Sequence, residues 1–395
     1  MSTSSLPQVC LFFEAHQPNR LKTYSFFDIG NDPFYENDDL NREILDKVSE
    51  RCYLPANKLL TDLIEKHSGN FKVSLSISGV LIEQMEIHRP DVLESFKKLH
   101  ATGGVEILAE TYYHSMGFHH NPAEFERQVK RQEAVVEKHF GVKPTTFRHT
   151  ELIYFNELAA YVEGMGYKGM LAEGVPALLG HRSPNYLYRS PNVKNMPVLL
   201  RHGGLSDDCT FRFSDQNWNE HPLTSEKFAA WCAASGGDIV NLFMDYENIG
   251  EHNDEASGIF DFWNAFPDAW QKLGGQFTTP AEAAKNFSVV DEYDCHDPSS
   301  WGDEEKDLSA WRGNMMQQEA RRKILLIEEA VLAKKDDELT HEWRKLQTSD
   351  HFYYMSTKGG AAGAVHASFS PFDNPYDAYL NFMNALSDMQ IRAEA

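Results

Sequence analysis

The stretch that most constrains the fold is residues 239–244, IVNLFM, because it is almost entirely apolar and stops abruptly at Asp245. Continuous apolar runs of this length are typical of strands that are buried on both faces of a parallel sheet. Glu247, Gly250 and His252 follow, so acidic residues and a turn-forming glycine come directly after the run. The pattern predicts a buried parallel strand whose C-terminal end carries carboxylates. In α/β barrels that end is where the chemistry takes place.

Other short apolar runs are also predicted to be strands, and they lie at residues 8–13, 71–77, 105–110, 146–150, 167–172 and 196–200. Segments with apolar residues three and four positions apart, the helical pattern, separate most of these runs. Regular alternation of strands and helices is typical of a parallel α/β arrangement. We therefore predict the α/β fold class, in the form of a parallel barrel of about seven strands.

The character of the chain changes near residue 290. Residues 291–307 are acidic and rich in turn-forming residues, and helical patterns without clear strands follow at 315–335, 338–347 and 373–392. We predict two domains on this basis. Residues 1–290 form the catalytic barrel, and residues 291–395 form a C-terminal α-helical subdomain that completes the substrate cleft.

Charge and cysteine content narrow the possible partners and the location. The net charge of −22 argues against nucleic acid or an anionic membrane as partner, because both require a basic face. No apolar run reaches the roughly eighteen residues of a membrane-spanning helix. The five cysteines are widely spaced without a CxxC pair, and the N-terminal residues lack the basic region of a secretory signal. These features predict reduced thiols and a cytoplasmic protein.

A second predicted strand also ends in an acid, because residues 146–150 run directly into Glu151. Arg148 would favour the ionised form of Glu151, although the two could equally form a structural ion pair. Asp245 and Glu247 are so close in sequence that the pKa of one of them should rise, as a general acid requires. A solvated acidic turn or a metal site would give the same sequence pattern. Two carboxylates from two strand ends are the minimum equipment for glycoside hydrolysis.

Two alternative classes remain open at this point. His16 follows the first predicted strand, and His114, His119 and His120 lie further along, so a metal hydrolase such as a sugar deacetylase is one alternative. No HExxH motif supports it, and the GxGxxG string at 164–169 leaves a predicted helix, which is the reverse of the dinucleotide-binding context. The second alternative is a non-catalytic glucan-binding protein. The preferred interpretation requires neither a metal nor a cofactor.

Five stretches in order along the chain resemble the conserved motifs of glycoside hydrolase family 57, and in particular its α-amylase branch. They are HQP at 16–18, GVEILAE at 104–110 with YYH at 112–114, FRHTELIY at 147–154, FMDYE at 243–247 with GEH at 250–252, and LSAWRGN at 308–314. The first motif alone is weak, whereas five motifs in the same order are specific.

The resemblance implies an incomplete seven-stranded (β/α)7 barrel with a C-terminal helical region. It implies that Glu151 is the nucleophile, that Asp245 is the acid/base and that Trp311 lines the substrate site. We expect the other substrate-binding residues to be His16, Gln17, Glu106, His114, Arg148, Glu247 and His252.

The activity implied by the resemblance is retaining cleavage of α-1,4-glucosidic bonds in starch- or glycogen-type glucans or maltooligosaccharides. A 4-α-glucanotransferase acting through the same site is the alternative within the family. An α-glucan is thus the expected partner, as substrate, and the sequence makes no prediction of the oligomeric state.

Overall fold

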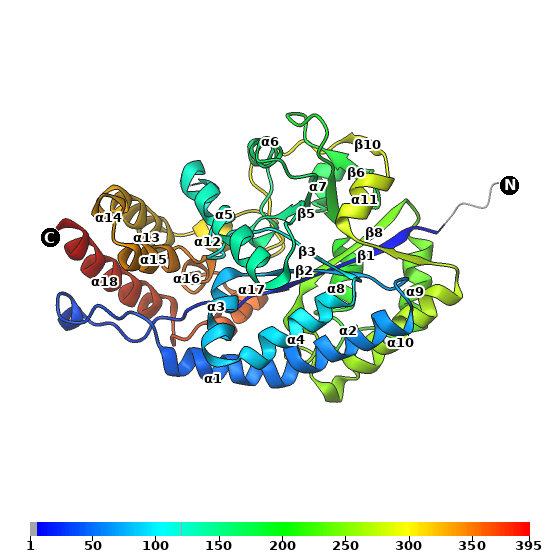
Figure 1. Cartoon of the computed structure of the whole chain (residues 1–395), viewed down its shortest axis with the longest axis horizontal. Coiled ribbons are helices and arrows are strands. Elements are labelled where there is room, and N and C mark those ends of the chain that lie inside the picture. Colours follow the sequence, from blue (N-terminus) through cyan, green and yellow to red (C-terminus); the bar gives the residue numbers. More distant parts are fainter. Residues whose placement is uncertain (1–5, 120) are drawn as a thin grey trace.

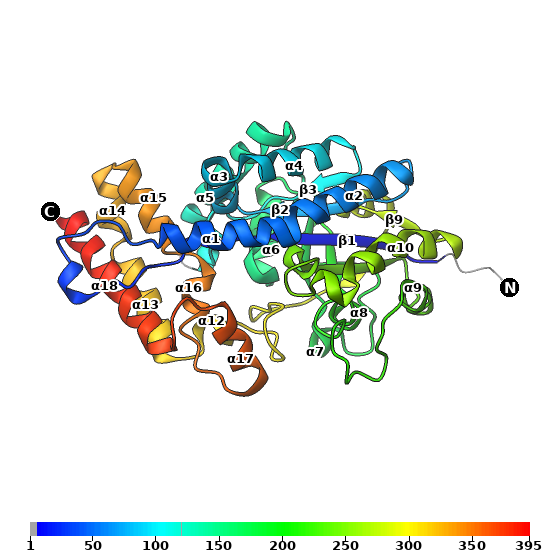
Figure 2. The same cartoon turned by 90° about the horizontal axis from the view of Figure 1, so that it is seen from below.

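The computed structural model describes residues 6–119 and 121–395; His120, one of the possible metal ligands named above, lies outside these residues. The molecule is elongated, with strands in one part and the helices α13, α14, α15 and α18 gathered at the other end (Figure 1). Both views show this separation (Figure 2).

Strand β1 (Gln8–Ala15) lies at the centre of the first sheet. It pairs in parallel with β2 (Val73–Ile77) on one side and with β8 (Ile239–Asp245) on the other, and β3 (Val105–Ile107) continues beyond β2. A second sheet contains the parallel strands β4 (Thr146–Arg148), β5 (Gly169–Glu173) and β7 (Val198–Arg201). All of these strands were predicted from apolar runs.

The two sheets meet at both edges and so form a barrel. Next to β3, a parallel bridge joins Ala109 to Phe147 of β4. Next to β7, the His202 amide donates to the Asn241 carbonyl at 2.8 Å, and the Asn241 side chain donates to the Leu200 carbonyl at 2.9 Å. Isolated bonds of this kind join the two sheets, whereas continuous ladders join the strands within each sheet. The predicted α/β fold with its incomplete seven-stranded barrel is confirmed.

Three short strands were not predicted. They are β6 (Leu187–Arg189), β9 (Gln276–Thr278) and β10 (Val289–Glu292). β9 extends the first sheet by pairing with the start of β1, and β10 pairs with β6. Because β10 crosses residue 290, the chain has no simple break there, and the division into residues 1–290 and 291–395 stays a prediction.

Helices surround the barrel and then form the C-terminal region. Those of the barrel region are α1 (Asp38–Val48), α2 (Leu54–Lys66), α3 (Gly79–His88), α4 (Pro90–Ala101), α5 (Pro122–Phe140), α6 (Asn156–Gly164), α7 (Pro176–Leu179), α8 (Gly203–Asp208), α9 (Ser225–Ala234), α10 (Ile259–Lys272) and α11 (Pro280–Asn286). Those of the C-terminal region are α12 (Ser309–Arg312), α13 (Met315–Leu326), α14 (Glu328–Lys334), α15 (Asp337–Lys345), α16 (Ser349–Tyr353), α17 (Gly360–Phe369) and α18 (Pro375–Glu394).

Side chains of β1 alternate between two hydrophobic cores. Leu11 and its odd-numbered neighbours pack outward against the surrounding helices. Cys10 and Phe12 point into the barrel, where they meet residues of β5, β7 and β8 such as Phe243. Because successive strand residues face opposite sides, Glu14 continues the inward set and carries its carboxylate to the C-terminal mouth of the barrel. All five cysteines are buried free thiols, as the sequence predicted.

The segment after β1 packs on α18, where the Tyr24 amide donates to Asn381 at 2.5 Å and the Gly30 amide and Tyr35 hydroxyl both donate to Asp388 at 2.7 Å. Figure 2 shows this segment beside the C-terminal helix. Within the described residues, no helix is long and apolar enough to cross a membrane.

Replacing Leu11 with Ala tests the dependence of the barrel on β1. Leu11 is fully buried, so its loss should reduce the free energy of unfolding by about 2–5 kcal/mol in a urea titration. Leu326→Ala is the control, because Leu326 is 62% exposed and its truncation should cost no more than about 0.5 kcal/mol. Equal losses in the two variants would contradict the packing described here.

Candidate active site

Asp245 is the last residue of β8 and lies beside Glu14 of β1 in the parallel register. Burial raises the pKa of Asp245 above its ordinary value, His252 opposes the rise, and the negative charge of Glu151 adds to it. Asp245 at the end of β8 thus interacts electrostatically with Glu151, which follows β4 and is remote from it in sequence. A carboxyl group that keeps its proton to higher pH is suited to act as a general acid.

Glu151 lies three residues beyond β4, in the single-turn helix η4 (Thr150–Leu152). Its backbone has φ of 59° and ψ of 25°, which is the left-handed region. For a residue other than glycine this conformation costs about 1–3 kcal/mol and is found mostly at functional positions, where surrounding contacts impose it. The backbone thus turns sharply after the strand and presents the Glu151 side chain at the barrel mouth.

Three groups surround the Glu151 carboxylate. The Trp301 indole donates to Oε2 at 2.8 Å, the Ser349 hydroxyl donates to Oε1 at 3.0 Å, and Nε2 of His114 lies 3.3 Å from Oε1. Burial by itself would raise the pKa of Glu151, but the hydrogen bonds and positive charge of His114, together with the Trp301 bond, hold that pKa below its ordinary value. Glu151 is therefore an ionised carboxylate at neutral pH.

A buried charge network supports His114 from below. Its Nδ1 lies 3.2 Å from Glu14 Oε1 and 3.4 Å from Glu110 Oε2, and Arg148 pairs with both of these carboxylates. None of the four side chains is more than 4% exposed. Burial would lower the pKa of His114, but the carboxylates around the ring outweigh it and raise that pKa well above its ordinary value. His114 thus connects the network to Glu151 as a cation.

His16 forms the next layer of the site. Its ring stacks on that of His114 with 3.9 Å between centroids and 19° between planes. Its Nδ1 lies 2.7 Å from the Ser78 hydroxyl and its Nε2 lies 3.1 Å from Asp350 Oδ2. Burial and the adjacent His114 lower the pKa of His16. The pKa of Asp350 falls despite burial, because His16 pairs with it.

Gln17 and Glu247 lie to one side of this cluster. The Gln17 amide donates to Glu247 Oε1 at 3.4 Å, and the Tyr53 hydroxyl donates to the same carboxylate. Burial raises the pKa of Glu247 to about 8. His252, by contrast, is exposed, and its ring meets Phe369 of α17 edge-on at 5.7 Å.

Comparison with known proteins now identifies the chain. The model of glycosyl hydrolase family 57 matches residues 10–296. This chain belongs to glycosyl hydrolase family 57. A curated relative from Methanocaldococcus jannaschii, named "Putative alpha-amylase", is 40% identical over 96% of this chain and 83% of its own length. The predicted family and the assignment as an α-amylase-like glycoside hydrolase are confirmed.

Solved structures share the fold at low sequence identity. The 4-alpha-glucanotransferase from Thermococcus litoralis aligns with a TM-score of 0.68 and 15% identity over 96% of this chain, which spans only 59% of that protein. The α-amylase AmyC from Thermotoga maritima aligns with a TM-score of 0.58 and 13% identity, covering 99% of this chain and 96% of its own. The family 57 fold is therefore shared by proteins named for different activities.

Three residues predicted to bind substrate lie elsewhere. Trp311 is 1% exposed and packs against Tyr353, so it presents no open face to a sugar. Glu106 accepts the Ala281 amide at 2.8 Å at the start of α11, because its mid-strand position places it below the barrel mouth. Arg148 is fully buried and makes no ion pair with Glu151 in the described part of the chain. It supports His114 instead.

Sequence reasoning did not assign several residues that contact the predicted site residues. Ser349 and Asp350 come from α16, and Trp301 comes from the acidic turn before α12. Glu14 carried a usable signal, since it ends the first apolar strand just as Asp245 ends the last one.

Two sets of side chains in the described residues have the composition of a metal site. One is His16, His114 and Asp350, and the other is Glu14, Glu110 and His114; in each set the possible ligand atoms lie within 4.8 Å of one another. A histidine must lose its proton to coordinate a metal. The raised pKa of His114 opposes that loss, so the arrangement favours a carboxylate-binding imidazolium over a metal ligand.

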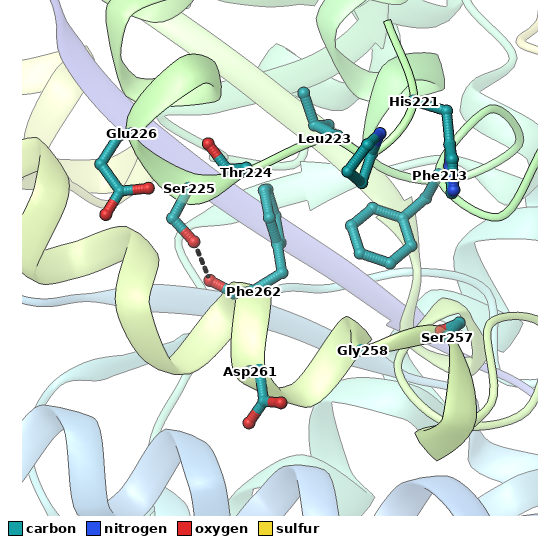
Figure 3. A pocket seen from close by; sticks show the side chains of 11 residues that line it. Phe213, His221, Leu223, Thr224, Ser225, Glu226, Ser257, Gly258, Asp261 and Phe262 are labelled. Atoms are coloured by element: carbon teal, nitrogen blue, oxygen red, sulfur yellow. Dashed lines mark hydrogen bonds between the residues drawn. The ribbon is translucent and has the colours of Figure 1, made fainter. Parts of the chain in front are cut away.

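Two hollows lie away from Glu151 and Asp245. One, of about 250 Å³, lies between α9 and α10 and is lined by residues such as Phe213, Leu223 and Phe262 (Figure 3). There the Ser225 hydroxyl donates to the Phe262 carbonyl at 2.7 Å. The other, of about 790 Å³, is lined by residues of η2 (Ser49–Tyr53), α2 and the turn after β8. Carboxylates line both hollows, Glu226 and Asp261 in the first and Glu50, Asp254 and Glu255 in the second, but neither hollow is lined by Glu151 or Asp245.

Replacing Trp301 with Phe tests what keeps Glu151 ionised. The substitution removes the indole donor, and loss of a hydrogen bond to the charged form raises a carboxyl pKa. We expect the pKa of Glu151 to increase in an NMR titration of ¹³C-labelled glutamate side chains, with the signal assigned through Glu151→Gln. Trp218→Phe, which changes a tryptophan beside Arg212, should leave that pKa unchanged. An unchanged pKa in Trp301→Phe would refute the assigned role.

Proposed function

We propose that this family 57 enzyme hydrolyses α-1,4-glucosidic bonds of starch- or glycogen-type glucans or maltooligosaccharides and retains the anomeric configuration. The observation that supports it most is the pair Glu151 and Asp245, whose pKa values are shifted in opposite directions. Opposite shifts of this kind distinguish the carboxylate suited to be the nucleophile from the carboxyl group suited to be the acid. The α-amylase name of the relative from Methanocaldococcus jannaschii agrees with this substrate class.

In the first step, the Glu151 carboxylate attacks the anomeric carbon while Asp245 transfers its proton to the glycosidic oxygen. The bond from the anomeric carbon to that oxygen breaks, the shortened glucan leaves with a new hydroxyl group, and a glucosyl ester forms on Glu151. In the second step, Asp245, now ionised, takes a proton from water. The resulting hydroxide equivalent attacks the anomeric carbon, which releases the sugar and restores both carboxyl groups.

His16, His114 and Asp350 are proposed to orient the sugar and the nucleophile in this mechanism. His16 and Asp350 are partly exposed at the site and carry hydrogen-bonding groups suited to sugar hydroxyls. His114 holds one oxygen of Glu151 and leaves the other to Trp301. Gln17, Glu247 and His252 are proposed to contribute to substrate binding from the side of Asp245.

A 4-α-glucanotransferase is the second candidate, because a structural neighbour bears that name. It would share the first step, after which a sugar hydroxyl replaces water. Products of maltoheptaose distinguish the two activities, since hydrolysis gives glucose and maltose whereas transfer gives longer chains. A cytoplasmic location is also proposed, in agreement with five unpaired cysteines.

Replacing either carboxylate tests the proposed pair. Glu151→Gln and Asp245→Asn should each lower kcat on maltoheptaose by at least about a thousandfold, because each step of the mechanism needs both groups. Glu319→Gln is the control, since Glu319 is paired with Arg322 on the surface of α13. Normal starch hydrolysis by Glu151→Gln would refute the nucleophile assignment. ¹H NMR of the first products should show the α-anomer.

The pH dependence of kcat/KM gives a separate test. Activity requires Glu151 ionised, and its lowered pKa places the acid limb below the ordinary glutamate value of about 4.3. Activity also requires Asp245 protonated, and its raised pKa places the alkaline limb above the ordinary aspartate value of about 3.9. The profile should therefore be bell-shaped, and Trp301→Phe should move only the acid limb upward. A profile whose acid limb lies above the ordinary glutamate value would contradict this assignment.

A further inference from the structure

Helix α17 buries little apolar surface against the rest of the protein. His366 is its one buried residue, and the sequence contains Gly360 and Gly363. Isolated helices of this length are marginal in water, and most gain their stability from a packed apolar face. The apolar side chains Val365 and Phe369 are instead 41% and 43% exposed.

His366 anchors the helix to the active-site region. Its ring stacks on Tyr353 with 3.7 Å between centroids and 14° between planes, and its Nε2 lies 3.3 Å from both carboxylate oxygens of Asp303. Lys358, just before the helix, donates to Asp303 at 2.7 Å. Polar and stacking contacts therefore fix α17 at both its start and its buried face.

Tyr353 connects this anchor to the catalytic carboxylates. Tyr353 follows Ser349 by one turn of α16, and the Ser349 hydroxyl donates to Glu151 Oε1 at 3.0 Å. The ring that carries His366 therefore lies one helical turn from a direct contact of Glu151, and burial together with the nearby acids raises the pKa of its phenol. Helix α17 is consequently held against a side chain that borders the reacting pair.

Phe369, the last residue of α17, lies on the side of the site where Asp245 is found. Its ring is 5.7 Å from that of His252 at 80° and 6.4 Å from that of Tyr353 at 67°. His252 belongs to the turn that follows β8 and Asp245, where its backbone amide donates to the Glu247 carbonyl at 2.9 Å. Phe369 is therefore an exposed aromatic ring beside the turn that begins at Asp245.

The position of the Phe369 ring relative to Asp245 determines which part of a substrate the ring can contact. An acid/base donates its proton to the glycosidic oxygen, so the sugar attached through that oxygen, the leaving group, lies on the side of Asp245. Aromatic rings pack well against the apolar CH surface of a glucose unit. We infer that Phe369, with His252 beside it, binds the first glucosyl unit of the leaving group, and that α17 is the element which holds this surface in place.

This inference rests on the proposed function and adds a specificity-determining residue to it. Phe369→Ala is tested on two substrates that both carry several glucose units on the side of the anomeric carbon but differ in what leaves. Maltoheptaose has a glucosyl leaving group, whereas α-maltotriosyl fluoride releases only fluoride, which cannot reach Phe369. We expect kcat/KM on maltoheptaose to fall about tenfold, the scale expected for losing a buried aromatic contact, and kcat/KM on α-maltotriosyl fluoride to stay within about twofold.

Further variants keep the test decisive. Phe369→Leu preserves apolar volume and helix formation without a flat ring, so it should show the same selective loss, and Phe369→Tyr should restore activity on maltoheptaose. Phe27→Ala is the matched control, because Phe27 is 83% exposed on the segment that packs against α18. It should behave as wild type on both substrates.

The possible outcomes separate the two proposals. Equal losses on both substrates, or unchanged maltoheptaose cleavage by Phe369→Leu, would overturn the leaving-group surface while the wild-type activity stood. Wild-type protein that cleaves neither substrate would refute the proposed function itself, and the inference about Phe369 would fall with it.

Discussion

The site depends on one interaction above all, the placement of the His114 imidazolium between Glu151 on one side and Glu14 and Glu110 on the other. A charge taken out of water is costly unless it is paired and hydrogen-bonded. Here Arg148 and His114 pair with Glu14 and Glu110, although burial still raises the pKa of Glu14 well above its ordinary value. Glu151 therefore has a positive neighbour that is itself stabilised by buried side chains.

Strand geometry explains why these groups meet. The inward-facing residues of β1 end in Glu14, those of β8 lead to Asp245, and β4 leads through Arg148 to Glu151. Parallel strands bring their C-terminal ends to one edge, so residues remote in sequence become neighbours without long side chains. The left-handed backbone at Glu151, and also at His114, then aims the two side chains at each other.

The barrel and the positions of Glu151 and Asp245 at the strand ends could be predicted because both leave local signals. A strand buried on both faces must be almost continuously apolar, and an acid at its end is visible in the sequence. Strand β10 is exposed along its whole length and β9 contains a single apolar residue, Phe277, so neither produces such a run. Their pairing depends on neighbours that the sequence does not place.

The remaining site residues could not be predicted for a related reason. Trp301, Ser349 and Asp350 reach the site from turns and helices whose position follows from tertiary packing. Trp311 was predicted to line the substrate site from the family resemblance. Its exposure, however, depends on the packing of Tyr353 against it, which the sequence does not reveal. Arg148 was placed near Glu151 by sequence proximity, yet the alternation of strand residues turned it inward to Glu14.

The groups that contact the Glu151 carboxylate come from both the barrel and the C-terminal region. His114 belongs to the barrel region, whereas Trp301 and Ser349 follow residue 290. A barrel separated from its C-terminal helices would keep the nucleophile but lose two of the three groups that hold its oxygens. The helices are thus not an appendage that could be exchanged between relatives as an independent module. Recombination or shortening in this region has to keep the turn before α12 and the start of α16 together with β4.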